Sequence, residues 1–210
     1  MNTAENRQIL RSGLRLWVFA VVGVGLVALV ENHTREEIIE NERQLVLRNL
    51  HALLPPETFN NNIVSDQVQV PADPLLGTTQ ASAVYRARLN NKPVAAVLTS
   101  IAPDGYSGRI HLLIGIYTDG RIAGVRVVKH AETPGLGDAI EHRKSDWIAG
   151  FDNKSLSNPD RPGWHVQRDG GEFDQFTGAT ITPRAVVAAV RRALLYYAKN
   201  ADMIFDQKQP

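Results

Sequence analysis

Apolar residues near the amino terminus form one continuous run, whereas most of the remaining chain alternates apolar and polar positions. The run covers Leu16–Val30 and is extended on its amino side by Gly13 and Leu14. At about 1.5 Å of rise per residue, a helix of this length spans roughly the hydrocarbon core of a bilayer. The pattern predicts a transmembrane anchor over residues 13–30.

Charged residues flank this run asymmetrically. The basic side carries Arg7, Arg11 and Arg15, and the acidic side carries Glu31, Glu36, Glu37 and Glu40. Positive residues favour the cytoplasmic side, so residues 1–12 are expected in the cytoplasm and the main domain outside the membrane. A cleaved signal peptide is the alternative, but the stretch from Val27 to His33 has no small-x-small cleavage site. We therefore expect an uncleaved anchor.

A second helical segment is predicted directly after the anchor. Thr34-Arg-Glu-Glu37 has the residues of a capping box, and apolar residues follow at helical spacing until Pro55-Pro56. This pattern predicts a membrane-proximal amphipathic helix over 31–56. Its charged face is most simply a solvated surface.

A third helix is predicted near the carboxyl terminus. Thr182 supplies an N-cap hydroxyl and Pro183 suits the first helical position, because proline has no N–H to satisfy there. Apolar residues at helical spacing then extend the prediction to about Lys199. Residues 201–210 are expected to form a C-terminal tail.

The central part of the chain alternates as β-strands do. The strands are predicted over 83–89, 94–98, 110–117 and 122–129. Asn90-Asn91 and Thr118-Asp-Gly120 provide turns between them, and a helix is expected over 138–148. Residues 57–80 are expected to form an irregular linker with at most one short strand near Val68. Successive antiparallel strands followed by helices predict an α+β domain over 81–200.

Composition excludes several kinds of chemistry. The 210 residues include no cysteine, so disulfides, thiolate metal sites and thioether-linked cofactors are excluded. The formal net charge is +1 with dispersed basic residues, so no nucleic-acid-binding footprint is visible. The sequence has no Gly-x-Ser-x-Gly nucleophile elbow of the hydrolase type. A redox centre would need oxygen or nitrogen ligands, noncovalent contacts or an ester.

The segment Asp174-Gln-Phe-Thr-Gly-Ala-Thr180 precedes the predicted C-terminal helix. Thr180 would lie where free backbone N–H groups and the helix dipole favour an anion, and Arg184 could help to neutralise it. Thr177, Gly178 and Ala179 form a small-residue turn that leaves room for a bulky group. The alternative is a turn and a helix cap with no ligand.

A second loop, His130-Ala-Glu-Thr-Pro-Gly-Leu-Gly137, follows the last predicted strand. Glu132 and Thr133 supply polar atoms, Pro134 and Gly135 shape the backbone, and Leu136 could cover a ring. The alternative is a loop that only ends the strand.

Other side chains give weaker signals. His130 and His142 have no partner at metal-ligand spacing, so we expect no metal site. Trp147 and Trp164 could stack on a ring, but aromatic residues in such positions usually belong to a core.

The threonine segment resembles the flavinylation motif of the FMN-binding domain family. In that family FMN is esterified through its phosphate to the last threonine of Asp-x-x-(Ser/Thr)-Gly-Ala-Thr, which corresponds to Thr180 here. Members also carry a Glu-Thr-Pro-Gly-Leu-Gly loop against the flavin, as at Glu132–Gly137. The resemblance implies covalent FMN at Thr180, with Asp174 binding a cation during flavin transfer or ordering the turn, and Thr182 and Arg184 nearby.

Most of the chain further resembles the G-type subunits of the Rnf (Rsx) ion-translocating electron transport complexes, with the flavin subunit of Na⁺-translocating NADH:quinone reductases as a more distant relative. The resemblance implies an electron-transfer subunit without stand-alone turnover, in a bacterial inner membrane with a periplasmic main domain. Its partners would be other subunits of a complex linking NADH and ferredoxin chemistry to ion movement, and a flavin transferase. A cofactor-free, membrane-tethered assembly module is the alternative.

Overall fold

The computed structural model describes the backbone of residues 3–206, with side chains for residues 11, 13–31, 33–35, 44 and 46–206. The chain divides into two compact units, Met1–Leu45 and Val46–Pro210.

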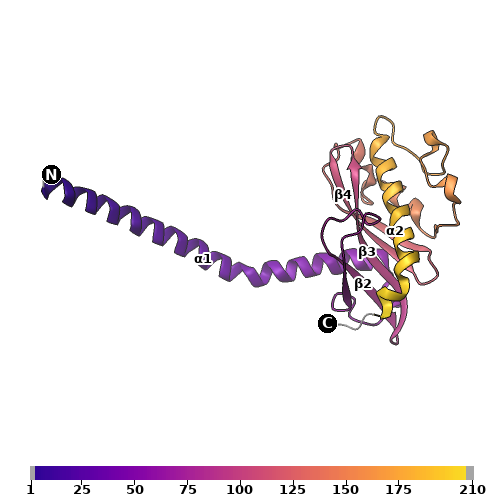
Figure 1. Ribbon diagram of the computed structural model, residues 1–210, viewed down its shortest axis with the longest axis horizontal. Helices are drawn as coiled ribbons and strands as arrows, with labels where there is room; N and C mark the ends of the chain where they lie inside the picture. The colour runs from indigo at the N-terminus through magenta and orange to yellow at the C-terminus, as the bar shows by residue number, and fades with distance from the viewer. Residues whose placement is uncertain (1–2, 207–210) are drawn as a thin grey trace. The chain divides into compact units, whose positions relative to one another are not determined.

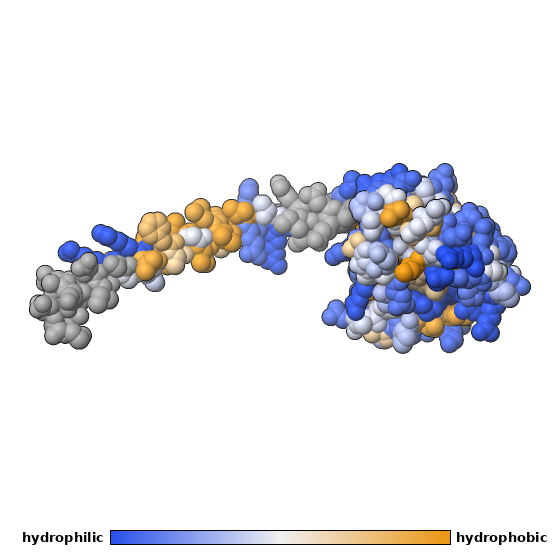
Figure 2. Space-filling view, turned by 90° about the horizontal axis from the view of Figure 1, so that it is seen from above, coloured by the Kyte–Doolittle hydropathy of each residue, from blue (hydrophilic) through white to orange (hydrophobic). Residues whose placement is uncertain are grey.

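The first unit is the amino-terminal part of helix α1, which runs without a break over Thr3–Leu53. In the described part of the chain, one stretch, Gly13–Arg35, is long and apolar enough to cross a membrane. Figure 2 shows it as a band of hydrophobic surface with hydrophilic residues on either side. The predicted helix start at Thr34 is wrong. Its hydroxyl donates to the Val30 carbonyl at 2.9 Å within the helix, instead of capping a new one.

The second unit is built on one antiparallel sheet. Its strands are β1 (Gln67–Val70), β2 (Ser82–Leu89), β3 (Lys92–Gly105), β4 (Gly108–Tyr117) and β5 (Ile122–Lys129). They lie in the sheet in the order in which they occur in the sequence (Figure 1). Together with the helices, this meander confirms the predicted α+β class, and β1 is the short strand expected near Val68.

The hairpin turns follow their sequence signals, but one strand is longer than predicted. Asn90 and Asn91 have φ angles of 51° and 65°, and Gly120 has φ 86°, as tight turns require. β3 continues beyond 98 until Gly105 pairs with Gly108 of β4. The register shift between Ala102 and Gly105 admits Pro103, which lacks an N–H for the ladder. This extension carries the β3–β4 turn to one end of the sheet.

Helix α2 (Ile181–Asp206) covers one face of the sheet (Figure 1). Its apolar side packs into a cluster with Leu98, Leu112 and Ile114. The helix extends past the predicted end near Lys199, because Ile204 is also buried in this cluster. Part of the predicted 201–210 tail is therefore helical, and residues 207–210 lie outside the described part.

The opposite face of the sheet is covered in part by the end of α1. Leu50, Leu53 and Leu54 pack there in a cluster that includes Val97 and Leu113. Burying apolar side chains on both faces is what holds a single sheet between layers of helix.

Short 3₁₀ helices occupy most of the remaining chain. They are η1 (Pro56–Thr58), η2 (Gly137–Ile140), η3 (Asp146–Phe151), η4 (Arg161–Gly163) and η5 (Gln167–Asp169). The helix predicted over 138–148 is wrong. Ser145 interrupts it by donating to the Ala139 carbonyl at 2.7 Å and accepting from the Trp147 N–H at 3.2 Å. Serine favours such local caps over a helix interior.

Candidate functional site

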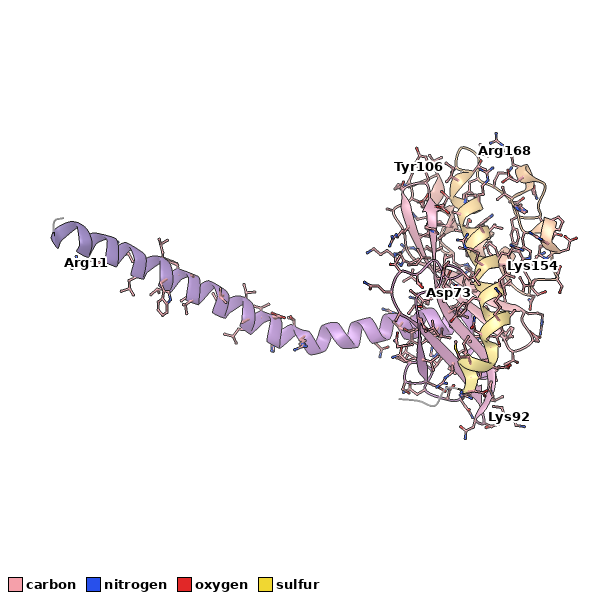
Figure 3. All side chains as sticks on the ribbon, viewed as in Figure 1. Arg11, Asp73, Lys92, Tyr106, Lys154 and Arg168 are labelled. Carbon is pink, nitrogen blue, oxygen red and sulfur yellow. The ribbon has the colours of Figure 1, made fainter. Side chains whose placement is uncertain are left out.

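A cavity of about 270 Å³ opens at the end of the second unit where α2 begins. Three segments form it: the β3–β4 turn, the loop after β5, and the residues leading into α2. Its lining residues are Tyr106, Glu132, Thr133, Leu136, Gly137, Gly178, Ala179, Thr180, Ile181 and Thr182. Figure 3 places Tyr106 at this end and Lys92 at the other. The two loops that the sequence singled out are thus brought together.

The start of α2 supplies the polar wall of the cavity. The Arg184 N–H donates to the Thr180 carbonyl at 3.3 Å, which makes Thr180 the N-cap. The amides of Ile181 and Thr182 belong to the first turn and have no intrahelical acceptor. Together with the helix dipole they favour an anion at this end. The prediction of Thr182 as the N-cap is wrong, because its hydroxyl donates instead to Glu132.

The turn before Thr180 brings the backbone close to the cavity. The Ala179 N–H donates to the Phe176 carbonyl at 3.1 Å, and Gly178 has φ +81°, which suits glycine. A Cβ on Gly178 would meet only Leu136, at 3.8 Å. The space beside this turn is therefore open, as the small residues predicted.

Glu132 is the centre of the polar contacts in the cavity. It is 4% exposed. One carboxylate oxygen accepts the Ser107 N–H at 3.0 Å, and the other accepts the Thr182 hydroxyl. A Cβ on Gly137 would lie 3.0 Å from Glu132 Oε2, and one on Gly105 would lie 2.9 Å from Oε1. Glycine at both positions gives the carboxylate its room.

The loop after β5 is closed by its own backbone. The Thr133 carbonyl accepts the N–H groups of Leu136 and Gly137, each at 3.1 Å. Gly135 has φ +76° in this turn. Pro134 and Gly135 shape the loop but do not line the cavity, whereas Leu136 lines it and is 44% exposed.

Three further predicted site residues, in addition to Pro134 and Gly135, lie outside the cavity lining. Thr177 and Asp174 are exposed, and the Asp174 carbonyl accepts the Trp147 indole N–H at 2.8 Å. Arg184 forms two hydrogen bonds to the Asp169 carboxylate, at 2.6 and 2.7 Å. This ion pair raises the pKa of Arg184 and lowers that of Asp169. The guanidinium is thus engaged away from Thr180.

A series of hydrogen-bonded ionisable groups contacts the loop after β5. The Glu132 N–H donates to His130 Nδ1 at 3.0 Å, and His130 Nε2 lies 3.1 Å from Glu141. Glu141 also contacts Arg143 and Lys144 at 2.8 and 3.3 Å. Arg143 first, then His130 and Lys144, lower the pKa of Glu141 to about 2. Among the described residues, no group of three or more His, Asp or Glu is arranged to hold a metal.

The two tryptophans belong to an aromatic cluster outside the cavity lining. Trp164 is 2% exposed and packs on Phe151 and Phe173. Trp147 meets Phe151 and Phe176 edge-on. Neither lines the cavity, so the interpretation as core residues is correct for Trp164.

Sequence reasoning assigned no role to Tyr106 and Ile181, although both line the cavity. Tyr106 is 67% exposed at the tip of the β3–β4 turn, and Ile181 is 45% exposed. A large aromatic residue in a Gly-rich turn was the available signal for Tyr106. Because Tyr106 is far from Thr180 in the sequence, the sequence alone could not show that both line the same cavity.

These residues fit the phosphate and ring of a flavin nucleotide. An N-cap hydroxyl and free first-turn amides suit a phosphoester, and glycine at position 178 leaves space beside it. Tyr106, Leu136 and Ile181 offer exposed apolar surface at the mouth of the same cavity, as a ring system requires.

Comparison with known proteins agrees with this geometry. The FMN-binding domain matches residues 105–195, and the RnfG N-terminal region matches residues 1–53. Relatives named as the G-type subunit of an "Ion-translocating oxidoreductase complex" include one from Pseudomonas aeruginosa, 51% identical over 204 residues, covering 97% of this chain and 95% of the relative. The chain belongs to the family of G-type subunits of ion-translocating oxidoreductase complexes.

Further members of this RnfG family match over similar lengths. The relative from Pseudoalteromonas atlantica is 47% identical, covering 94% of this chain and 92% of the relative. The relative from Shewanella oneidensis is 46% identical, covering 96% of this chain and 95% of the relative. In this chain, the region that matches the FMN-binding domain, residues 105–195, includes all three segments that form the cavity.

Proposed function

We propose that this subunit binds FMN covalently, through a phosphoester to the Thr180 hydroxyl, and relays electrons within an ion-translocating oxidoreductase complex. The observation that carries the proposal is the position of Thr180. It caps α2 and lines the cavity, inside an FMN-binding domain. Of the two neighbouring threonines, Thr177 is outside the cavity lining, and the hydroxyl of Thr182 is bonded to Glu132. Thr180 is therefore the threonine of this segment that both caps α2 and lines the cavity.

The chain's own residues would hold the nucleotide in defined ways. The amides of Ile181 and Thr182 would donate to the phosphate at the helix start, and Gly178 would leave room for it beside the turn. Tyr106 and Leu136 would cover the ring system at the cavity mouth and exclude water from it. FMN, when bound, supplies the electron-transfer chemistry, and the protein sets its position and surroundings.

The partners in this proposal follow from the relatives' names. Those proteins are subunits of ion-translocating oxidoreductase complexes, so the partners here would be other subunits of such a complex. An electron-transfer role of this kind requires no turnover by the isolated subunit. A separate flavin transferase would form the ester.

The location proposed is a membrane, with residues 13–30 as anchor and 1–12 in the cytoplasm. The apolar stretch Gly13–Arg35 and the arginines before it support this orientation. The segments 31–56 and 57–80 would then connect the anchor to an FMN-binding domain over 81–200 in the periplasm. A covalent link suits that compartment, because a released flavin could not easily be recovered.

The covalent link is tested by in-gel fluorescence of denatured protein. Full-length protein produced with its modifying enzyme should fluoresce under ultraviolet light after denaturing electrophoresis. Thr180→Val should lose this signal completely, because it lacks the hydroxyl, while thermal unfolding stays near that of the unmodified parent. Thr177→Val is the matched control and should keep the signal. Fluorescence retained by Thr180→Val would falsify the assignment of the attachment site.

A further inference from the structure

Among the described residues that line the cavity, Glu132 alone carries a formal charge. The other lining side chains are aromatic, aliphatic, hydroxyl-bearing or glycine. The Glu132 carboxylate is buried and fixed, since the Ser107 N–H and the Thr182 hydroxyl each donate to one of its oxygens. A negative charge is thus held at one position in the cavity wall.

Two of the cations near the cavity segments form ion pairs with carboxylates other than Glu132. Arg184 is bonded to Asp169, and Lys144 contacts Asp138 and Glu141. His130 accepts the Glu132 N–H at Nδ1, and its Nε2 lies beside Glu141. Among the described lining residues, none offsets the charge of Glu132.

An uncompensated negative charge in the cavity wall affects the reduction potential of a flavin bound there. Reducing a flavin adds negative charge to its ring system, and a buried carboxylate nearby opposes this. The effect is larger in a partly enclosed cavity than in water, because the effective dielectric constant is lower. The charge affects the reduced form more than the oxidised form, so it shifts the equilibrium between them.

We propose that Glu132 lowers the reduction potential of FMN in this cavity, in addition to fastening the β3–β4 turn to the start of α2. The inference rests on the proposed binding of FMN. It assigns Glu132 a tuning and positioning role, rather than direct attachment of the cofactor.

The test is a potentiometric titration of the FMN-loaded, full-length protein and its Glu132→Gln variant. Glutamine keeps the shape and both contacts: its amide oxygen accepts the Ser107 N–H, and its amide N–H donates to the Thr182 hydroxyl oxygen. Only the charge is lost. At a fixed ambient potential, we expect the ratio of reduced to oxidised flavin to rise at least tenfold, about 30 mV for a two-electron couple.

Two controls separate charge from structure. Thr182→Val breaks the hydroxyl contact but keeps the carboxylate, so its potential should not rise. Asp119→Asn removes a carboxylate that lies beside Tyr197, a residue about 25 Å along α2 from Thr180 at about 1.5 Å per residue. Its potential should match that of the parent.

The outcomes are distinct. An unchanged or lower potential in loaded Glu132→Gln overturns the inference, as does an equal rise in Thr182→Val. If Glu132→Gln takes up no FMN, the reduction potentials of Leu136→Lys and Leu136→Gln are compared instead. Leu136 lies at the exposed mouth of the cavity. The lysine variant should have the higher potential of the two, and equal potentials would overturn the inference. Parent protein without covalent FMN would instead contradict the proposed function.

Discussion

Two threonines, two residues apart, have different roles at the start of α2. Both line the cavity, but Thr180 caps the helix, whereas the Thr182 hydroxyl is bonded to buried Glu132. The threonine motif could be recognised in the sequence because cap residues and glycine turns are local signals. The Glu132 contact could not, because it joins residues 50 positions apart. The Arg184–Asp169 ion pair could not be predicted for the same reason, since Asp169 lies in a separate turn.

The ion pairs of Glu141 predict a pH dependence at the residue scale. Its folded-state pKa is about 2, against an ordinary value of 4.5. A depressed carboxyl pKa contributes stability that is present above the ordinary value and is lost as the pH falls toward 2. Glu141→Gln should therefore be less stable than the parent at pH 7, with a difference that shrinks between pH 4.5 and 2. Urea unfolding at several pH values measures this, and a pH-independent difference would contradict it.

At the scale of elements, long-range polar contacts join what local patterns could not. Strand turns at Asn90-Asn91 and Gly120 were predictable, because positive φ angles select those residues. The lengths of β3 and α2 were not predictable, since they depend on contacts with distant parts of the chain. β3 continues as long as it pairs with β4, and α2 continues as long as its residues are buried in the core. Arg86 and Arg88 donate to the carbonyls of Ile204 and Phe205, which ties β2 to the end of α2. This contact explains why the helix continues past Lys199.

Asp66 holds both arginines and should be important for stability. Its carboxylate accepts from Arg86 Nε at 2.6 Å and Arg88 Nε at 2.9 Å, and Arg86 is 1% exposed. Removing one partner of a buried ion pair costs about 3–5 kcal/mol. We expect Asp66→Ala to lose that much in urea unfolding of the full chain. Asp119→Ala, which breaks an exposed pair with Arg121, should lose less than about 1 kcal/mol. Equal losses would contradict the role of burial.

At the scale of the whole molecule, the apolar run predicted the candidate span but not the continuous helix. The structure continues α1 from Thr3 to Leu53, and the Thr34 hydroxyl is bonded within this helix instead of starting a new one. The side of the membrane on which each unit lies follows only from charge, with the basic residues predicting a cytoplasmic amino terminus.

The absence of cysteine allows this orientation to be measured directly. Lys92→Cys places one thiol on an exposed residue of the second unit (Figure 3). A membrane-impermeant maleimide added to intact cells with a permeabilised outer membrane should label it. Thr3→Cys, at the amino terminus, should be labelled only after cell lysis. The reverse pattern would place the FMN-binding domain on the cytoplasmic side.

A covalent bond between FMN and Thr180 is the central element of the proposed function. Mass spectrometry of native, membrane-extracted protein tests it after trypsin digestion, which should release the peptide from Asp169 to Arg184. We predict that this peptide carries one FMN phosphoester and that fragmentation places it on Thr180. An unmodified peptide, or a modification on Thr177 or Thr182, would contradict the account.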